Sequence, residues 1–162
     1  MSVAGARTYS ITDVDRVLTT AVRTLIQIMA GTTTPLELVR AWVSQSSSTV
    51  STQLQVQINR KTATATGMSA GSIKKLGPAS DPSPRIQTGG GNTSGVFATA
   101  EGTDGDVLVP DVWNYLTGWV WTPLQKSEMI FVDVAEMIAL KLPTAPGAGV
   151  TVTCGMIFTE LR

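Results

Sequence analysis

The sequence predicts an all-β protein, an antiparallel β-sandwich of about eight or nine short strands in a jelly-roll-like arrangement. Residues 52–61 alternate strictly between apolar and polar side chains, as a half-buried strand does. Residues 150–160 form a second β-prone stretch, with an apolar side chain at every other position from Val150 to Phe158. Further short β-prone stretches are separated by turns rich in Gly, Pro and Ser. The Cys…Trp…Cys pattern of immunoglobulin domains is absent, which favours the jelly roll. A chain of 162 residues is long enough for one core, so we expect a single sandwich domain over 7–162 behind a flexible arm of residues 1–6.

The N-terminal part of the domain has the composition of strands. Residues 8–11 and 17–20 are predicted as short strands on either side of a turn at 13–15, and residues 22–30 as a longer strand. A helix over residues 13–29 is the alternative, because apolar residues recur there at helical spacing. The many β-branched residues in that stretch favour strands.

A turn at residues 31–35 precedes a predicted strand over 36–45, and a loop follows at 46–48. Strict alternation in the strand over 36–45 would place Leu36, Leu38, Arg40 and Trp42 on one face and Glu37, Val39, Ala41 and Val43 on the other. In the strand over 52–61, one face carries Leu54, Val56 and Ile58, and the other carries Gln53, Gln55, Gln57 and Asn59. The glutamine row indicates a solvated face, with a polar contact surface as the alternative.

Residues 62–95 form a long loop excursion without periodicity. The stretch is dense in Gly, Ser, Thr and Pro, which excludes long regular elements, although residues 73–76 could form a short strand or a helical turn. Connections of this length are uncommon in compact domains and are often functional or ordered by a partner.

Residues 101–123 (EGTDGDVLVPDVWNYLTGWVWTP) combine acidic and aromatic side chains. We expect a Gly/Asp-rich turn, a strand, a tight turn at 116–118 and a second strand, which together would make a hairpin. Three further strands are predicted after it, at residues 129–134, 137–142 and 150–160, and the first two are expected to pair. In the last strand Val150, Val152, Cys154, Met156 and Phe158 share one face.

The charge composition excludes several classes of partner. Only 15% of residues are charged, and twelve basic residues balance twelve acidic ones, so no net field attracts nucleic acid. No apolar stretch approaches the roughly 20 residues that a membrane-spanning helix needs. A hydroxyl-rich surface with few charges favours a protein that buries much of its exterior in an assembly.

The chain contains no histidine and a single cysteine, Cys154. Ser-His-Asp and Cys-His catalysis, the commonest metal ligand and an internal disulfide are therefore excluded. Cys154 lies in an apolar run, where a buried and inert thiol is expected. We expect no enzymatic activity and no cofactor.

Four acidic residues form the best candidate for a site. Oxygen ligands around a glycine turn are typical of calcium sites, although the spacing matches no complete calcium loop. The alternative is an Asp-Gly turn capped by its own side chains. The residues are Glu101, Asp104, Asp106 and Asp111.

Four aromatic residues in the same stretch are candidates for an interface. Core packing of at least two rings is expected, and the others could anchor a subunit contact or stack against sugar rings. They are Trp113, Tyr115, Trp119 and Trp121.

The order of segments resembles a group of small virion structural proteins of tailed bacteriophages. The resemblance is carried by LIQIMAGTTTPLELVRAWVSQSSS, TQLQVQINRKT, the Gly/Pro-rich excursion, the acidic-aromatic stretch and the terminal VTVTCGMIFTE. It implies a capsid decoration or cement protein on the virion surface, a homo-oligomer with a trimer favoured, bound to the major capsid protein through edge strands, the long loop and the N-terminal arm. It transfers no functional residues. Another self-assembling subunit (shell, tail, fibre or filament) and a carbohydrate-binding module are the alternatives.

Overall fold

The computed structural model describes residues 6–18, 21, 23–46, 53–88, 94–114, 116–146 and 150–161. In this part the regular secondary structure is nearly all strand, which confirms the predicted all-β class. No helix there is long and apolar enough to cross a membrane. Eleven strands and one short 3-10 helix occur in the order β1 (Arg7–Val17), β2 (Arg23–Met29), β3 (Leu36–Gln45), β4 (Gln53–Lys61), β5 (Ser72–Lys75), β6 (Gly95–Val96), β7 (Asp104–Asn114), β8 (Trp119–Trp121), η1 (Lys126–Glu128), β9 (Ile130–Val132), β10 (Met137–Leu142) and β11 (Thr151–Glu160).

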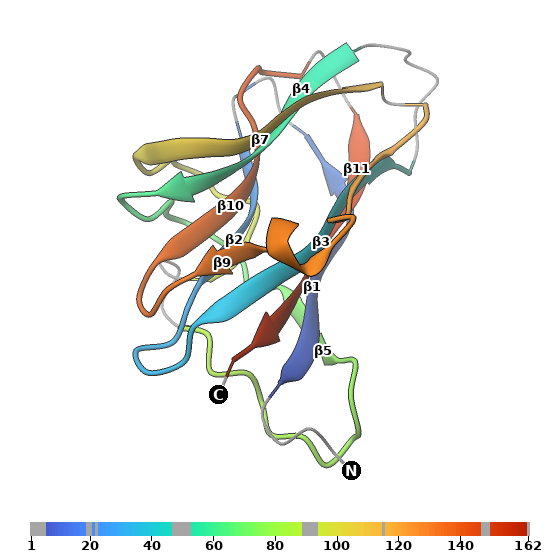
Figure 1. The fold of residues 1–162 in the computed structure, drawn as a ribbon. Helices are drawn as coiled ribbons and strands as arrows, with labels where there is room; N and C mark the ends of the chain where they lie inside the picture. The colour runs from blue at the N-terminus through green and yellow to red at the C-terminus, as the bar shows by residue number, and fades with distance from the viewer. Residues whose placement is uncertain are drawn as a thin grey trace.

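The strands form two antiparallel sheets packed as a sandwich (Figure 1). The β3 sheet has the order β5-β1-β11-β3-β8, with β9 also paired to β3. The β10 sheet has the order β6-β2-β10-β4-β7. Apolar side chains from the inner faces of both sheets make one continuous core.

The strand pairing is that of a jelly roll. Among the eight principal strands the first pairs with the last, β1 with β11, and the nested pairs β2 with β10, β3 with β8 and β4 with β7 follow. A ribbon folded double and rolled up has this pairing. Consecutive principal strands alternate between the two sheets, except that β4 and β7 are neighbours in the β10 sheet. The jelly-roll-like prediction is confirmed, and β5, β6 and β9 are short additions to the eight strands.

The first strand is longer than expected. The predicted turn at residues 13–15 is wrong, because β1 continues through it and pairs with β11 from Arg7 to Val17, with a bulge between Asp13 and Arg16. Asp15 adopts a φ of 53°, which fits an extra residue at a bulge. The alternative of a helix over residues 13–29 is also wrong, because both β1 and β2 are extended strands paired with distant strands. Residues 19, 20 and 22 lie outside the described residues.

The bounds predicted for β3 are correct, but its faces are not. Ile157 of β11 pairs with Arg40 and Phe158 pairs with Leu38, which leaves Val39 as the extra residue of a bulge. Alternation therefore shifts by one position within the strand. The buried residues are Leu36, Leu38, Ala41 and Val43, while Arg40 and Trp42 face outward.

In β4 the predicted alternation holds over its first half. Leu54, Val56 and Ile58 are buried, and Gln53 and Gln55 are exposed as a solvated face requires. Register shifts on either side of Asn59 then break the pattern, so that Asn59 and Lys61 are buried.

The hairpin predicted over residues 101–123 is wrong. Strand β7 pairs with β4 and β8 pairs with β3, so the two strands belong to different sheets and the chain turns a corner between them. Gly118 lies at this corner with a φ of 69°. The expected Asp-Gly turn is part of β7, which begins at Asp104. Strands β9 and β10 are likewise not a pair, because they also lie in different sheets.

The excursion over residues 62–95 packs against the sandwich. Strand β5 extends the β3 sheet by pairing with β1, and Ile86 is buried in the core. The hydroxyl of Tyr9 donates a hydrogen bond to the carbonyl oxygen of Pro82 at 2.9 Å. Residues 89–93 lie outside the described residues.

Two phenylalanines of the β3 sheet test where the core lies. Phe158 is fully buried and stacks on Tyr9 with the ring centroids 5.6 Å apart, whereas Phe131 is 44% exposed. Phe158→Ala should lower the free energy of unfolding by about 3–5 kcal/mol because it opens a cavity. Phe131→Ala should cost less than about 1 kcal/mol. Urea unfolding of both variants checks this, and equal losses would contradict the assignment of the core.

Candidate binding surface on the outer face of β3

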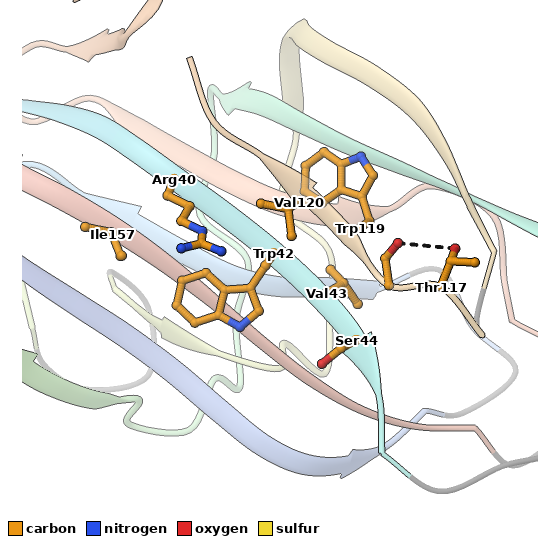
Figure 2. Close-up of a pocket in the computed structure, with 9 residues that line it drawn as sticks. Arg40, Trp42, Val43, Ser44, Thr117, Trp119, Val120 and Ile157 are labelled. Carbon is orange, nitrogen blue, oxygen red and sulfur yellow. Dashed lines mark hydrogen bonds between the residues drawn. The ribbon is translucent and has the colours of Figure 1, made fainter. Parts of the chain in front are cut away.

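A cavity of about 340 Å³ opens between the outer face of β3 and the corner that joins β7 to β8. Figure 2 shows Arg40 and Trp42 leaving β3 beside each other, with Trp119 and Val120 on the neighbouring strand. Most of the lining is apolar. The lining residues are Arg40, Trp42, Val43, Ser44, Thr117, Gly118, Trp119, Val120 and Ile157.

The indole of Trp42 packs directly on the backbone of β11 at Gly155. The two residues are opposite each other in the β3–β11 pair. A Cβ atom at Gly155 would lie 2.0 Å from Cζ2 of Trp42, so any side chain there displaces the ring. The missing side chain lets the ring approach the sheet closely, and Trp42 stays half-buried although it faces outward.

Arg40 is the charged group of this cavity. Its guanidinium carbon lies 5.9 Å from the ring centroid of Trp42, which is within cation–π range. Arg40 is exposed, and no described carboxylate lies within ion-pairing distance of it. The cavity thus presents a cation without an acidic partner beside a large aromatic ring.

Both hydroxyls at the cavity donate to backbone carbonyls. Ser44 Oγ donates to the carbonyl oxygen of Thr153 at 3.3 Å. Thr117 Oγ1 is 3.2 Å from the carbonyl oxygen of Asn114 and 3.4 Å from that of Gly118; Figure 2 draws the second contact. The Arg40 guanidinium and the indole N–H of Trp42 are therefore the side-chain donors that the cavity offers to a ligand.

Exposed apolar side chains continue from the cavity along the chain through β8 and β9. Ten large hydrophobic side chains are exposed in the described part of the chain, and five of them fall within residues 116–134. Leu124 is 94% exposed. We call these five the β8–β9 apolar group: Leu116, Val120, Leu124, Phe131 and Val134.

The aromatic residues predicted as interface candidates have mostly structural positions. Trp113 and Trp119 are buried in the core, which confirms that at least two rings pack there, and Trp121 is half-buried against it; Tyr115 lies outside the described residues. Nε1 of Trp119 donates to Oδ2 of Asp111 at 2.8 Å and ties β8 to β7 across the corner. Because β7 and β8 lie in different sheets, Trp113 does not face Trp119 or Trp121 across a hairpin. Sequence reasoning missed Trp42, because its role depends on a glycine 113 positions later and on the register between two strands.

Two of the four predicted acidic residues lie beside buried lysines. Oδ1 of Asp104 is 3.0 Å from Nζ of Lys61, and its Oδ2 is 2.5 Å from Nζ of Lys141. Oε2 of Glu101 lies 3.8 Å and 3.5 Å from the same two nitrogens, and Glu101 also accepts hydrogen bonds from Thr24. The ammonium groups occupy the place beside these carboxylates that a bound cation would take.

The other two acidic residues do not join this cluster. Asp111 accepts the hydrogen bond from Trp119, and Asp106 is exposed on β7. Within the described residues no group of three or more histidine, cysteine or acidic side chains is placed to hold a metal ion. The arrangement is a neutral cluster of two cations and two anions at one end of the β10 sheet.

The surroundings of Asp104 and Cys154 shift the pKa values of these two groups. Partial burial raises the pKa of Asp104, but hydrogen bonds and charge from Lys141 and Lys61 outweigh it and hold that pKa below its ordinary value. Burial raises the pKa of the Cys154 thiol, and the nearby Asp13 carboxylate adds to the rise. Cys154 is therefore an un-ionised core thiol, as expected.

The contact between Trp42 and Gly155 is testable by a double-mutant cycle. Gly155→Ala should lower the free energy of unfolding by about 1–3 kcal/mol, because the new methyl group displaces the indole. In a Trp42→Ala background the same substitution should cost nearly nothing. Gly105→Ala is the matched control, because its new Cβ would meet no atom closer than 3.4 Å. Additive losses in the cycle would contradict direct packing of the two residues.

The acid–lysine cluster predicts a pH dependence of stability. The pKa of Asp104 is lower in the folded protein than its ordinary value near 3.8. The carboxylate therefore makes its full contribution to the free energy of unfolding above that ordinary value, and this contribution is lost as the pH falls through the folded pKa. Asp104→Asn should cost about 1–3 kcal/mol at neutral pH. The difference in the free energy of unfolding between wild type and this variant should become smaller as the pH falls from about 5 to about 3. Thermal unfolding over this range measures it, with Asp106→Asn as the control that keeps the wild-type profile. A pH-independent difference would refute the coupling.

Comparisons of the chain with protein-family models, with curated proteins and with solved structures find no match. The jelly-roll assignment rests on the order and pairing of the strands. The candidate surface rests on the cavity, the Trp42–Gly155 contact and the cation of Arg40.

Proposed function

We propose that this chain is a non-enzymatic structural protein of a bacteriophage virion. In this role it is a capsid decoration protein that forms a small homo-oligomer and binds the major capsid protein of the head shell. The observation that carries the proposal is the β8–β9 apolar group beside the Trp42 cavity. Exposed apolar side chains gathered on one region are typical of a surface that a protein partner covers.

The composition of this surface supports protein contact. Tryptophan and arginine are enriched among the residues that dominate binding free energy, and Trp42 and Arg40 lie together here. Val120 lines the same cavity, and Leu124 and Phe131 are exposed in the segment that follows β8 along the chain. Only 15% of the chain is charged, which is consistent with a surface that a partner covers.

The free edge of β7 is a poor site for adding a strand from another molecule. Strand β7 ends the β10 sheet, so one of its edges is unpaired within the described chain. Pro110 has no backbone N–H to offer, and Asp106 and Asp111 place negative charge along the strand. The proposed contact therefore uses the outward face around β3, β8 and β9 and not the free edge of β7.

The absence of catalytic groups is consistent with this role. The chain has no histidine, its one thiol is buried, and the clustered carboxylates Glu101 and Asp104 contact lysines. The resemblance of the segment order to phage virion proteins supports the location in a virion. The single jelly roll also fits a second candidate, a shell subunit that assembles by itself.

An add-back assay tests the proposal. Purified chain mixed with virions that lack it should bind at regular positions on the head, visible by electron microscopy and quantified by sedimentation. Leu124→Ser should weaken binding by about tenfold or more, because it removes an apolar contact. Leu76→Ser is the control. Leu76 is also exposed, but it follows β5, which lies at the opposite edge of the β3 sheet from β8.

Two results would decide against decoration. Absence of the chain from purified virions, together with no binding on add-back, would reject the proposed role. Formation of closed shells or fibres by the purified chain alone would instead support the second candidate. Mass spectrometry of virions and light scattering of the purified chain separate these outcomes.

A further inference from the structure

We propose that the Trp42 cavity is a socket for a carboxylate-bearing segment of a protein partner, in which an aspartate, a glutamate or a chain-terminal carboxylate stands next to an aliphatic side chain. This inference rests on the proposed function in taking the partner to be a protein. It adds the chemistry by which that partner is recognised.

Arg40 supplies the charge complementarity. Arg7, Arg16 and Arg60 each have a carboxylate within ion-pairing distance, whereas the described contact of the Arg40 side chain is with the indole of Trp42. None of the residues lining the cavity is acidic. A guanidinium presents N–H donors in a fork that matches a carboxylate, so an anion is the group that this cavity is equipped to bind.

The apolar walls of the cavity favour an aliphatic residue next to the carboxylate in the partner's sequence. Trp42, Val120 and Ile157 are apolar, and the ring of Trp42 is held against the sheet by its contact with Gly155. A volume of about 340 Å³ is at the small end of binding pockets. It suits one or two side chains and not a long ligand.

The hydroxyls of the cavity favour a peptide over a sugar. A sugar ring carries several hydroxyls, each of which loses hydrogen bonds to water on binding and needs partners in the site. Here Ser44 and Thr117 already donate to carbonyl oxygens, which leaves the guanidinium of Arg40 and the indole N–H of Trp42 as the side-chain donors. One cation and an apolar wall match an acidic residue beside an aliphatic one.

An array of immobilised octapeptides tests the proposal with the purified chain. Each aliphatic-rich peptide is printed in three versions, with aspartate, asparagine or lysine at a central position. We expect the aspartate versions to bind about tenfold more strongly than the lysine versions. Arg40→Glu should reverse this preference, and Trp42→Ala should weaken binding to every version.

The controls separate the socket from general charge effects. Lys74→Glu changes the net charge by the same amount on β5, away from the cavity, and should keep the wild-type preference. Unchanged thermal midpoints show that the variants are folded. Equal binding to the three versions, a preference that Arg40→Glu does not reverse, or no binding to any peptide would overturn the proposal, as would glycan-array binding that requires Trp42.

This experiment is independent of virion location. If the array shows the carboxylate preference but the chain is absent from virions, the socket stands and the virion role fails. If the chain decorates virions but the array shows no carboxylate preference, the virion role stands and the socket fails.

Discussion

The pairing of β11 with both β1 and β3 is the constraint on which the rest of the structure depends. The last strand lies in the middle of the β3 sheet, where Glu160 is opposite both Arg7 and Leu36. Neither of those strands can complete its hydrogen bonds until the end of the chain is in place. Because these contacts are so distant in sequence, closing them costs chain entropy that the buried core must offset. Once they form, the nested pairs β2–β10, β3–β8 and β4–β7 follow from the same roll.

The candidate surface depends on the same pairing. Trp42 lies over Gly155 only in this register, since a slip of one residue would turn every side chain of the strand to the other face. The bulge at Val39 keeps Leu36 and Leu38 in the core while Arg40 and Trp42 face outward. The bulge in β3 therefore places apolar residues in the core and Arg40 and Trp42 on the surface. Bulges of this kind are common next to functional sites in sheets.

The buried lysines of the β10 sheet are paired with carboxylates. Lys61 and Lys141 are buried but contact Glu101 and Asp104, so the cluster carries no net charge. Buried ions of this kind persist because removing one partner leaves the other unpaired. Arg40 is an exposed charge without an ion-pair partner among the described residues, and it lies beside the Trp42 cavity. Such a surface is consistent with a module whose exterior is covered by protein in an assembly.

The sequence by itself determined the all-β class, the jelly-roll-like type, the bounds of β3 and β10, those of β11 to within one residue, and the inner face of β11. Side-chain alternation and turn residues act over a few positions, so these features can be predicted locally. It also indicated that several of the rings in residues 101–123 pack in the core. Only the tertiary structure decided that β7 and β8 belong to different sheets, that β1 runs through the expected turn, and that β3 changes face at Val39. It alone brought Glu101 and Asp104 to buried lysines and placed Trp42 over Gly155. The physical reason is that strand register and sheet membership are set by partners far away in the chain, and a local pattern does not contain them.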